Sequence, residues 1–521
     1  MTKHTILFKF CLTSKLMALV LGIGFVAAGF GCSSSSSFIA TGNPLLDLRN
    51  PELLERERVQ AAEQAWDEVE RGVRVRERTR QALKNLAWSN ATTPKLRMTV
   101  LELLMSDESV EGSEDSRVMA RLILPTERSP DAVRIIANRA VIGNWTELVP
   151  ALVRSYTRQS PNVPDTERDE RAALLALRPG MNIERIIYDV FLNPSMGSRD
   201  VREQAVLRLS QRTRDDAWAL LARLDPSGEL RRALIDSDFD LDAEEASRVM
   251  VGDLRAAKRE LGVMPDTAME ISWLTNLRQH PDQRNQRLNG QWWIETASAV
   301  STLNKEQRED LALRHLEPVR WANANRPAWL SFDREGLLGL AGERLNKRVH
   351  HKRKNQSGEQ PRQERLGDWA DVLSWCDVLT ILAVDDAIAN PRVVEQIFTQ
   401  RALDKKDSST EYGGVIEQDA DSGFRAVLYR PRSRDRVNDQ RFVASDDMFR
   451  YSDRSLVHYH MHANKRNNNR YAGPSAADLV NVQMSGRTNL VFTSLGKDEL
   501  NVDLYFPNGV VIDLGQLYQQ K

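Results

Sequence analysis

The aromatic residues divide this chain of 521 residues into two parts of different composition. All eleven tryptophans lie between Trp66 and Trp375, whereas seven of the nine tyrosines lie at or after Tyr412. A single uniform fold would mix the two residue types along its length, so we place a boundary near residues 390–410. At roughly 150 residues per domain the length predicts about three units. We therefore expect a multidomain protein.

Charge and cysteine content exclude several classes of protein. The 72 basic residues are balanced by 73 acidic ones, a formal net charge of −1, which argues against nucleic acid as the main partner. Hydrophobic residues make up 41% of the chain. This fraction is sufficient for large hydrophobic cores and excludes a chain that is disordered throughout. The three cysteines, Cys11, Cys32 and Cys376, are too few for a disulfide framework.

The first 32 residues have the composition of an export signal. Three lysines precede an uncharged apolar run over residues 16–31. This run is shorter than the roughly 20 residues that span a bilayer comfortably, but it suits the core of a signal peptide. Ordinary signal cleavage near Ala27 and Ala28 is one interpretation, and an uncleaved anchor is another.

The end of this run resembles a bacterial lipoprotein signal, in which a small residue precedes a cysteine that becomes lipidated. Gly31 precedes Cys32, and a run of serines follows. The resemblance implies that residues 1–32 are a signal peptide with Cys32 as the site of lipid attachment, and that residues 33–49 are a flexible tether. It also implies a protein exported to the cell envelope, either lipid-anchored to the outer membrane or periplasmic.

Residues 50–345 carry the periodicity of amphipathic helices. Leu, Ala, Arg and Glu are abundant, and the apolar residues recur at helical spacing. Segments 201–209 and 217–224 are two such stretches separated by a short polar segment, which predicts an αα-hairpin. Segments 132–141 and 145–156 form a similar pair.

These pairs resemble HEAT-type repeats, although the spacing between them is irregular. The resemblance predicts that residues 50–345 form an α-helical, solenoid-like array in which each pair buries its apolar face against its neighbours. Such an array would dock a protein partner or a substrate. An irregular all-α region without true repeats is the alternative.

A basic polar linker is expected over residues 346–365. Its cations run from Lys347 to Lys354, and polar, turn-forming residues follow. A solvated loop is the ordinary interpretation of such a run, and a site for anionic lipid headgroups or another polyanion is the alternative. The apolar stretch 366–390 then predicts a connecting helix.

Residues 391–521 are predicted to form an α/β domain. After one more helix, over residues 391–403, short runs rich in β-branched and aromatic residues are separated by turn residues. A helix is predicted over residues 475–484, with Gly473 and Pro474 ahead of its first turn. Strands are expected at 413–417, 424–430, 455–460, 490–494, 502–506 and 510–514.

This last part contains residues suited to a metal site. His460 and His462 lie two positions apart on a predicted strand, so their imidazoles point to the same side. Neutral imidazoles are good zinc ligands, and a carboxylate such as Asp478 supplies a third. Three such ligands with an open fourth position are typical of a hydrolytic zinc site. Glu411, directly before Tyr412 and two glycines, is the candidate base.

In this order, the patterns Glu411-x-Gly-Gly, His460-x-His462 and Ser475-x-x-Asp478 resemble the JAMM motif of JAB/MPN-type metallopeptidases. The resemblance covers residues 391–521. It implies a mixed sheet flanked by helices, like that of cytidine deaminases, and hydrolysis of peptide or isopeptide bonds. It also implies that the two histidines and Asp478 are ligands of Zn2+, that Glu411 is base and proton shuttle, and that Ser475 stabilises the oxyanion.

The chain departs from the family pattern in two places. Ala463 follows the second histidine, where the family usually has proline, and residues 463–474 make a longer insert than is common. The insert is polar and cationic, so it would form a lid or a substrate-binding loop, or else distort the site. The pair His458 and His460 matches the same spacing. We prefer the pair His460 and His462, because a tyrosine before the first histidine and a small residue after the second resemble the family better.

Three functions follow from these features. The leading one is an exported, lipid-anchored zinc-dependent peptidase or isopeptidase, with a peptide or protein substrate. The second is a catalytically inactive envelope lipoprotein scaffold whose helical array binds protein partners. In the third, the basic run 347–354 is the functional element and binds anionic lipid.

Overall fold

The computed structural model describes most of the chain after residue 40, in these ranges: 41–89, 91–158, 160, 162–194, 203–352, 363–419, 423–438, 441–464, 468, 470 and 472–519. The expected signal peptide, Cys32 and part of the expected tether therefore lie outside the described residues. So do residues 420–422 between the first two expected strands, the end of the basic run, and part of the insert 463–474. The chain divides into two compact units, one up to Thr99 and one from Val100 onward.

The first unit consists of helices. They are α1 (Pro44–Asp47), α2 (Glu55–Glu70), α3 (Arg76–Trp88) and the beginning of α4 (Pro94–Met105). In α2 the buried residues Val59, Ala62, Trp66 and Val69 recur every three or four positions, so they form one apolar face. Buried residues of α3, among them Leu83, pack in the same unit.

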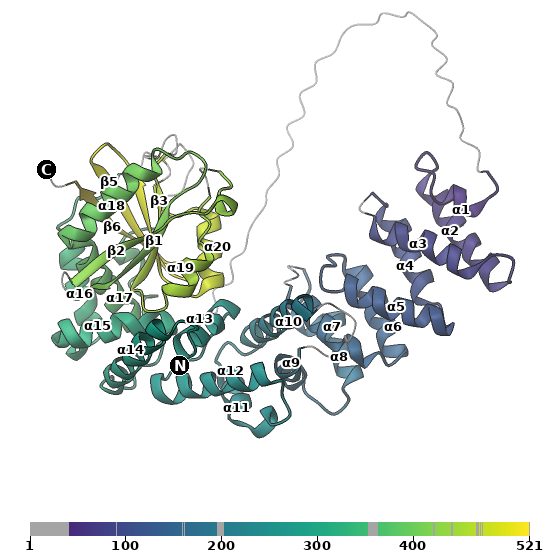
Figure 1. Cartoon of the computed structure of the whole chain (residues 1–521), viewed down its shortest axis with the longest axis horizontal. Helices are drawn as coiled ribbons and strands as arrows, with labels where there is room; N and C mark the ends of the chain where they lie inside the picture. The colour runs from purple at the N-terminus through teal and green to yellow at the C-terminus, as the bar shows by residue number, and fades with distance from the viewer. Residues whose placement is uncertain are drawn as a thin grey trace, which may run out of the picture. The chain divides into compact units, whose positions relative to one another are not determined.

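The second unit begins with a long helical region (Figure 1). Its helices are α5 (Val110–Ile123), α6 (Pro130–Ile142), α7 (Val149–Thr157), α8 (Asp169–Leu177), α9 (Ile183–Leu192), α10 (Glu203–Leu224), α11 (Glu229–Asp236), α12 (Glu245–Ala256), α13 (Ala268–Arg278), α14 (Gln283–Ser301), α15 (Leu316–Asn325), α16 (Arg334–Leu345), α17 (Trp375–Ala389) and α18 (Pro391–Asp404). The expected helical character is confirmed. The repeat array stays a prediction.

One predicted helix pair is present and another is not. α6 and α7 are separated by a turn at Gly143 and Asn144, the latter with φ of 50°, and by a short 3-10 segment. The expected hairpin over residues 201–224 is wrong, because α10 runs without a break for 22 residues. The polar stretch between its two apolar halves contains neither glycine nor proline. Without a breaker, polar side chains alone do not end a helix.

The C-terminal part of the second unit is built on a six-stranded mixed sheet. Its strands are β1 (Gly413–Asp419), β2 (Gly423–Tyr429), β3 (Val457–His462), β4 (Asn489–Ser494), β5 (Glu499–Tyr505) and β6 (Val511–Tyr518), in the order β2-β1-β3-β4-β5-β6. β3 and β4 are parallel, and the other neighbours are antiparallel. α19 (Asp446–Tyr451) precedes β3, and α20 (Ala476–Ser485) joins β3 to β4. The predicted strands and the helix after Ser475 are confirmed.

Helices from the earlier part of the unit pack against this C-terminal part. Trp273 of α13 donates its indole N–H to the carbonyl of Asp453 over 2.8 Å. A side chain at Gly486, just after α20, would lie 2.3 Å from the carboxyl carbon of Glu270, so α13 approaches this turn very closely. α17 is buried on almost all sides, since 13 of its 15 residues are buried.

The described part of the basic linker lies along the edge strand β6. The N–H of Gln516 donates to the carbonyl of Val349 over 2.8 Å, and the N–H of Asp513 donates to the carbonyl of Glu364 over 2.7 Å. Arg348 forms an ion pair with Asp385 of α17. These residues form a loop in which Lys347 and Lys352 are exposed, and backbone hydrogen bonds and a buried carboxylate tie this loop to the fold. The last two cations of the run, at positions 353 and 354, lie outside the described residues.

The expected connecting helix over 366–390 is shorter than predicted. A 3-10 turn (Leu366–Trp369) comes first, and α17 begins at Trp375 behind Ser374. In the ranges that the structure describes, no helix combines the length and the apolar character needed to cross a bilayer.

Candidate metal centre

The candidate ligands lie at the centre of the sheet. His458, His460 and His462 alternate along β3, so all three project from one face, and each is at most 6% exposed. β3 pairs with β1 in a register that sets Gly413 opposite His460. The same register continued by two residues sets Glu411 opposite His462. The two sequence patterns that are 49 residues apart are thus brought together by one strand pairing.

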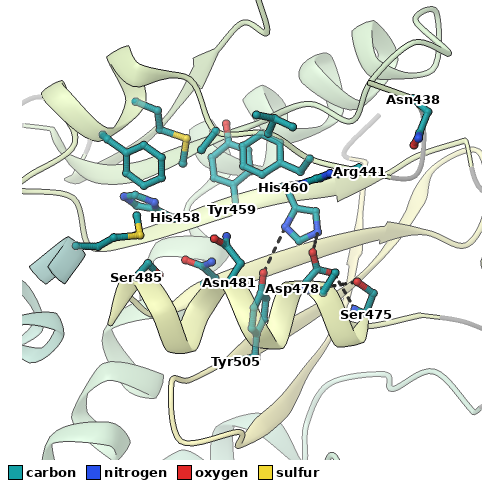
Figure 2. Close-up of a pocket in the computed structure, with 18 residues that line it drawn as sticks. Asn438, Arg441, His458, Tyr459, His460, Ser475, Asp478, Asn481, Ser485 and Tyr505 are labelled. Atoms are coloured by element: carbon teal, nitrogen blue, oxygen red, sulfur yellow. Dashed lines mark hydrogen bonds and ion pairs between the residues drawn. The ribbon is translucent and has the colours of Figure 1, made fainter. Parts of the chain in front are cut away.

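Two imidazoles and two carboxylates converge at this point. The Nε2 atoms of His460 and His462 are 3.1 Å apart. The two carboxylate oxygens of Asp478 lie 3.5 Å from Nε2 of His460 and 3.7 Å from Nε2 of His462. Oε1 of Glu411 lies 3.8 Å from Nε2 of His462. Figure 2 shows the imidazole of His460 directed at the carboxylate of Asp478 in the first turn of α20.

This group could hold a metal ion. Ligand atoms of Glu411, His460 and His462 all lie within 4.8 Å of one another, and all three residues are buried. The oxygens of Asp478 lie beside this trio and reach both imidazoles. A set of imidazole nitrogens and carboxylate oxygens suits zinc and other borderline divalent cations. Either carboxylate is thus positioned to be the third ligand.

The first turn of α20 fixes the position of Asp478. The N–H of Ser475 donates to Oδ2 of Asp478 over 2.7 Å, and the N–H of Asp478 donates to Oγ of Ser475 over 3.3 Å. This is a reciprocal capping box at a helix N-terminus. Because the Ser475 hydroxyl accepts a hydrogen bond here, its own hydrogen is available for another acceptor. Ser475 is exposed and lines the cavity next to Asp478.

The site holds Asp478 in its charged form. Burial works to raise the pKa of Asp478, but the imidazoles of His460 and His462 and the N–H of Ser475 outweigh burial. The pKa of this carboxyl is therefore held well below its usual range. A charged carboxylate is the form that ligates a cation.

His460 is held by two aromatic residues that the sequence patterns do not include. The ring of Phe442 stacks on the imidazole, with centroids 5.5 Å apart and planes 10° apart. Oη of Tyr505 lies 3.4 Å from Nδ1 of His460. In the tautomer that donates from Nδ1 to the tyrosine oxygen, Nε2 carries the lone pair that would bind a metal. Neither aromatic residue has a local sequence signal, because each lies in a distant segment.

The two glycines after Tyr412 lie where a side chain would collide with neighbouring segments. A side chain at Gly413 would lie 2.5 Å from the Phe442 ring, and one at Gly414 would lie 1.9 Å from the carbonyl oxygen of Val427. The glycines therefore make room for Phe442 and for the neighbouring strand β2.

His458 belongs to a different set of contacts. Its Nε2 lies 3.0 Å from Oγ of Ser452 and 3.2 Å from the guanidinium of Arg487. Since a guanidinium only donates, Nε2 of His458 accepts. Burial and the charge of Arg487 hold the pKa of His458 well below the usual value for histidine, so the His458 ring is neutral. The geometry therefore joins His460 and His462, and not His458, to both carboxylates.

Described residues of the insert 463–474 are tied to the fold. The side-chain amide of Asn468 donates to the carbonyls of His462 and Ser494 over 3.0 and 2.9 Å. The N–H of Gly473 donates to the hydroxyl of Thr493 over 3.3 Å. The lid or substrate-loop role of the insert stays a prediction.

Comparison with known proteins gives no relative. The chain matches no family model, no curated protein and no solved structure.

Proposed function

We propose that this protein is a zinc-dependent hydrolase of the JAMM type that cuts peptide or isopeptide bonds. The observation that carries the proposal is the convergence of the buried residues His460, His462 and Glu411 with the half-buried Asp478 at the centre of the sheet. In this proposal the two histidines and Asp478 hold the zinc. Bound zinc would supply a Lewis acid that polarises a carbonyl and makes water more acidic.

The remaining residues have roles that their positions support. Glu411 would accept a proton from the attacking water and deliver it to the leaving nitrogen. The hydroxyl of Ser475, which keeps a hydrogen to donate, would stabilise the oxyanion. Phe442 and Tyr505 would hold the His460 ring in the orientation that ligation needs.

The proposal includes a location and a use for the helices. From the resemblance of residues 1–32 to a lipoprotein signal, we propose export and lipid anchoring through Cys32. The helical region would dock the protein or peptide that is cut.

The test is the metal content of the full-length chain after incubation with zinc and removal of the excess. We expect about one zinc per chain, as three protein ligands with an open position predict. His460→Gln should lose most of this zinc. His458→Gln is the matched control, because it changes the same residue type on the same face of β3, and it should keep the zinc.

The readouts are mass-spectrometric metal analysis and the circular dichroism spectrum of each variant. A wild-type chain that is folded and yet retains no zinc would contradict the proposal. So would a His460→Gln variant that retains as much zinc as His458→Gln.

A further inference from the structure

A cleft of about 600 Å³ opens beside the candidate metal centre (Figure 2). Asp478, Asn481 and Ser485 line it from one side, and their spacing of three and four residues places them on one face of α20. His458 and His460 of β3 line the opposite side. The volume lies in the usual range of about 300–1,000 Å³ for small-ligand pockets.

The two ends of the cleft differ in chemistry. In Figure 2, His460, Ser475 and Arg441 lie toward one end, and His458 and Ser485 lie toward the other, with Asn481 between them. The first end contains the candidate ligands and is polar.

The second end, called the apolar end below, has apolar side chains beside His458 and Ser485. The ring of Phe449 lies 6.3 Å from that of His458, and both line the cleft. Met448, next to Phe449 on α19, is only 1% exposed and lines the cleft as well. Binding of an apolar group in a cleft with such walls is favourable, because the group displaces water from apolar surface.

A residue of the helical region completes this apolar end. Met269 of α13 lines the cleft. Its neighbour Glu270 lies against Gly486, which follows Ser485 at the end of α20. Since Ser485 lies at the apolar end, Met269 lies there too. A segment that precedes His460 by 191 residues thus forms part of the cleft.

We propose that this cleft is a selectivity pocket for an apolar side chain of the size of Leu, Met or Phe, carried by the substrate residue beside the bond that is cut. The inference rests on the proposed hydrolase function and names its substrate class. The amide of Asn481, which both donates and accepts, lies where it can pair with the backbone of that residue. A substrate with glycine at this position would leave the apolar end filled with water.

The test measures the affinity of the zinc-loaded full-length chain for two small hydroxamates by isothermal titration calorimetry. The hydroxamate group chelates zinc, so both probes are held at the same place. Acetohydroxamate carries only a methyl group, whereas 4-methylpentanohydroxamate carries a leucine-sized chain. We expect the larger probe to bind about 10- to 100-fold more tightly, because it buries several further carbon atoms.

The variant that tests the pocket is Met269→Glu, which places a charge at the apolar end. Glutamate is favourable in the first turn of α13, so the variant should fold. The advantage of the larger probe should fall below about threefold in this variant. Met484→Glu is the matched control, because Met484 is on α20 but is 60% exposed and does not line the cleft. That control should keep the full advantage.

The outcomes separate this inference from the proposed function. If the chain binds zinc and acetohydroxamate but the larger probe binds no more tightly, the pocket inference is overturned and the hydrolase proposal stands. The inference is also overturned if Met269→Glu and Met484→Glu keep the same advantage. If the folded chain holds no zinc, the function proposal fails, and the inference fails with it.

Discussion

Two carboxylates at the metal centre, those of Glu411 and Asp478, are each positioned to be the third metal ligand. Glu411 lies in the compact trio with His460 and His462. Asp478 is fixed by its capping box, and its oxygens reach both imidazoles. A base must keep a free oxygen to accept a proton, whereas a ligand gives its oxygen to the metal. Distances alone therefore do not assign the two roles, but metal content and turnover do.

We predict that Glu411→Gln keeps its zinc and lowers kcat by about 10²- to 10⁴-fold, because it removes only the proton acceptor. Asp478→Asn should lose most of the zinc. Both changes replace a carboxylate with an amide of the same shape, so each is the control for the other. The measurements are metal content and cleavage of a peptide digest followed by mass spectrometry.

The opposite pattern, with zinc lost from Glu411→Gln and kept in Asp478→Asn, would show that Glu411 is the ligand. A wild-type chain that holds zinc but cleaves no peptide would favour the inactive scaffold.

The site residues that the sequence predicts are those with local patterns. His460 and His462 follow the two-residue period of a strand, and Ser475 with Asp478 follows the spacing of a capping box. Phe442, Tyr505 and Met269 reach the site from three distant segments. Their positions depend on how the chain folds back on itself, and no local spacing encodes that.

At the level of elements, the helix α17 is fixed at its start by a buried hydrogen-bond chain. The N–H of Ala312 donates to Nδ1 of His315 over 3.1 Å, so the other ring nitrogen carries the hydrogen. That nitrogen donates to Oδ1 of Asp377 over 2.9 Å. Asp377 also caps α17 together with Ser374. The chain of contacts ties α17 to the turn before α15.

This arrangement makes stability depend on pH. Burial works to raise the pKa of Asp377, but the hydrogen bond from His315, the charge of Arg314 and the N–H of Ser374 hold it well below its usual range. A carboxyl whose pKa is lower in the folded state stabilises the fold above its unfolded pKa of about 4. That contribution is lost as the pH falls from about 4 toward the folded value.

We predict that Asp377→Asn lowers the free energy of unfolding at pH 7 by about 1–3 kcal/mol. At pH 3 the difference from wild type should be smaller, because wild type has itself begun to lose the contribution. Urea unfolding at both pH values measures this. Exposed Asp371→Asn is the control and should change stability by less than about 0.5 kcal/mol at either pH. A difference for Asp377→Asn that is equal at pH 7 and pH 3 would contradict the argument.

The α10 helix shows why the local sequence pattern wrongly predicts a helical hairpin over residues 201–224. Its polar middle has the composition of a turn, yet Thr213 in that stretch donates its hydroxyl to the carbonyl of Leu209, one turn earlier in the helix. Arg214, in the same stretch, donates to the hydroxyl of Ser247 over 3.0 Å. Thr213 thus finds its partner within the helix, whereas the partner of Arg214 lies on α12 and is brought close only by the folded unit.

At the scale of the whole molecule, composition locates the change from helices to strands but not the packing between them. The split between tryptophan and tyrosine falls near residues 390–410, and the first strand begins at Gly413. The tryptophans nevertheless take part in the C-terminal packing, since Trp273 donates to Asp453 and Trp321 packs on Phe424 with centroids 5.1 Å apart. Long-range contacts of this kind leave no trace in local composition.

The last prediction concerns which part of the second unit folds alone. A fragment of residues 391–521 contains all six strands that the structure describes but lacks α13 and α17. Removal of α17 exposes apolar side chains that normally pack on it. Exposure of one large apolar side chain costs about 1.5–3 kcal/mol of stability. We expect this fragment to lack a cooperative urea transition by far-ultraviolet circular dichroism. A fragment of residues 266–521 keeps both helices and should unfold in one cooperative transition. If the shorter fragment unfolds as sharply and at the same urea concentration as the longer one, the strand-bearing part is independent of the helices that pack on it.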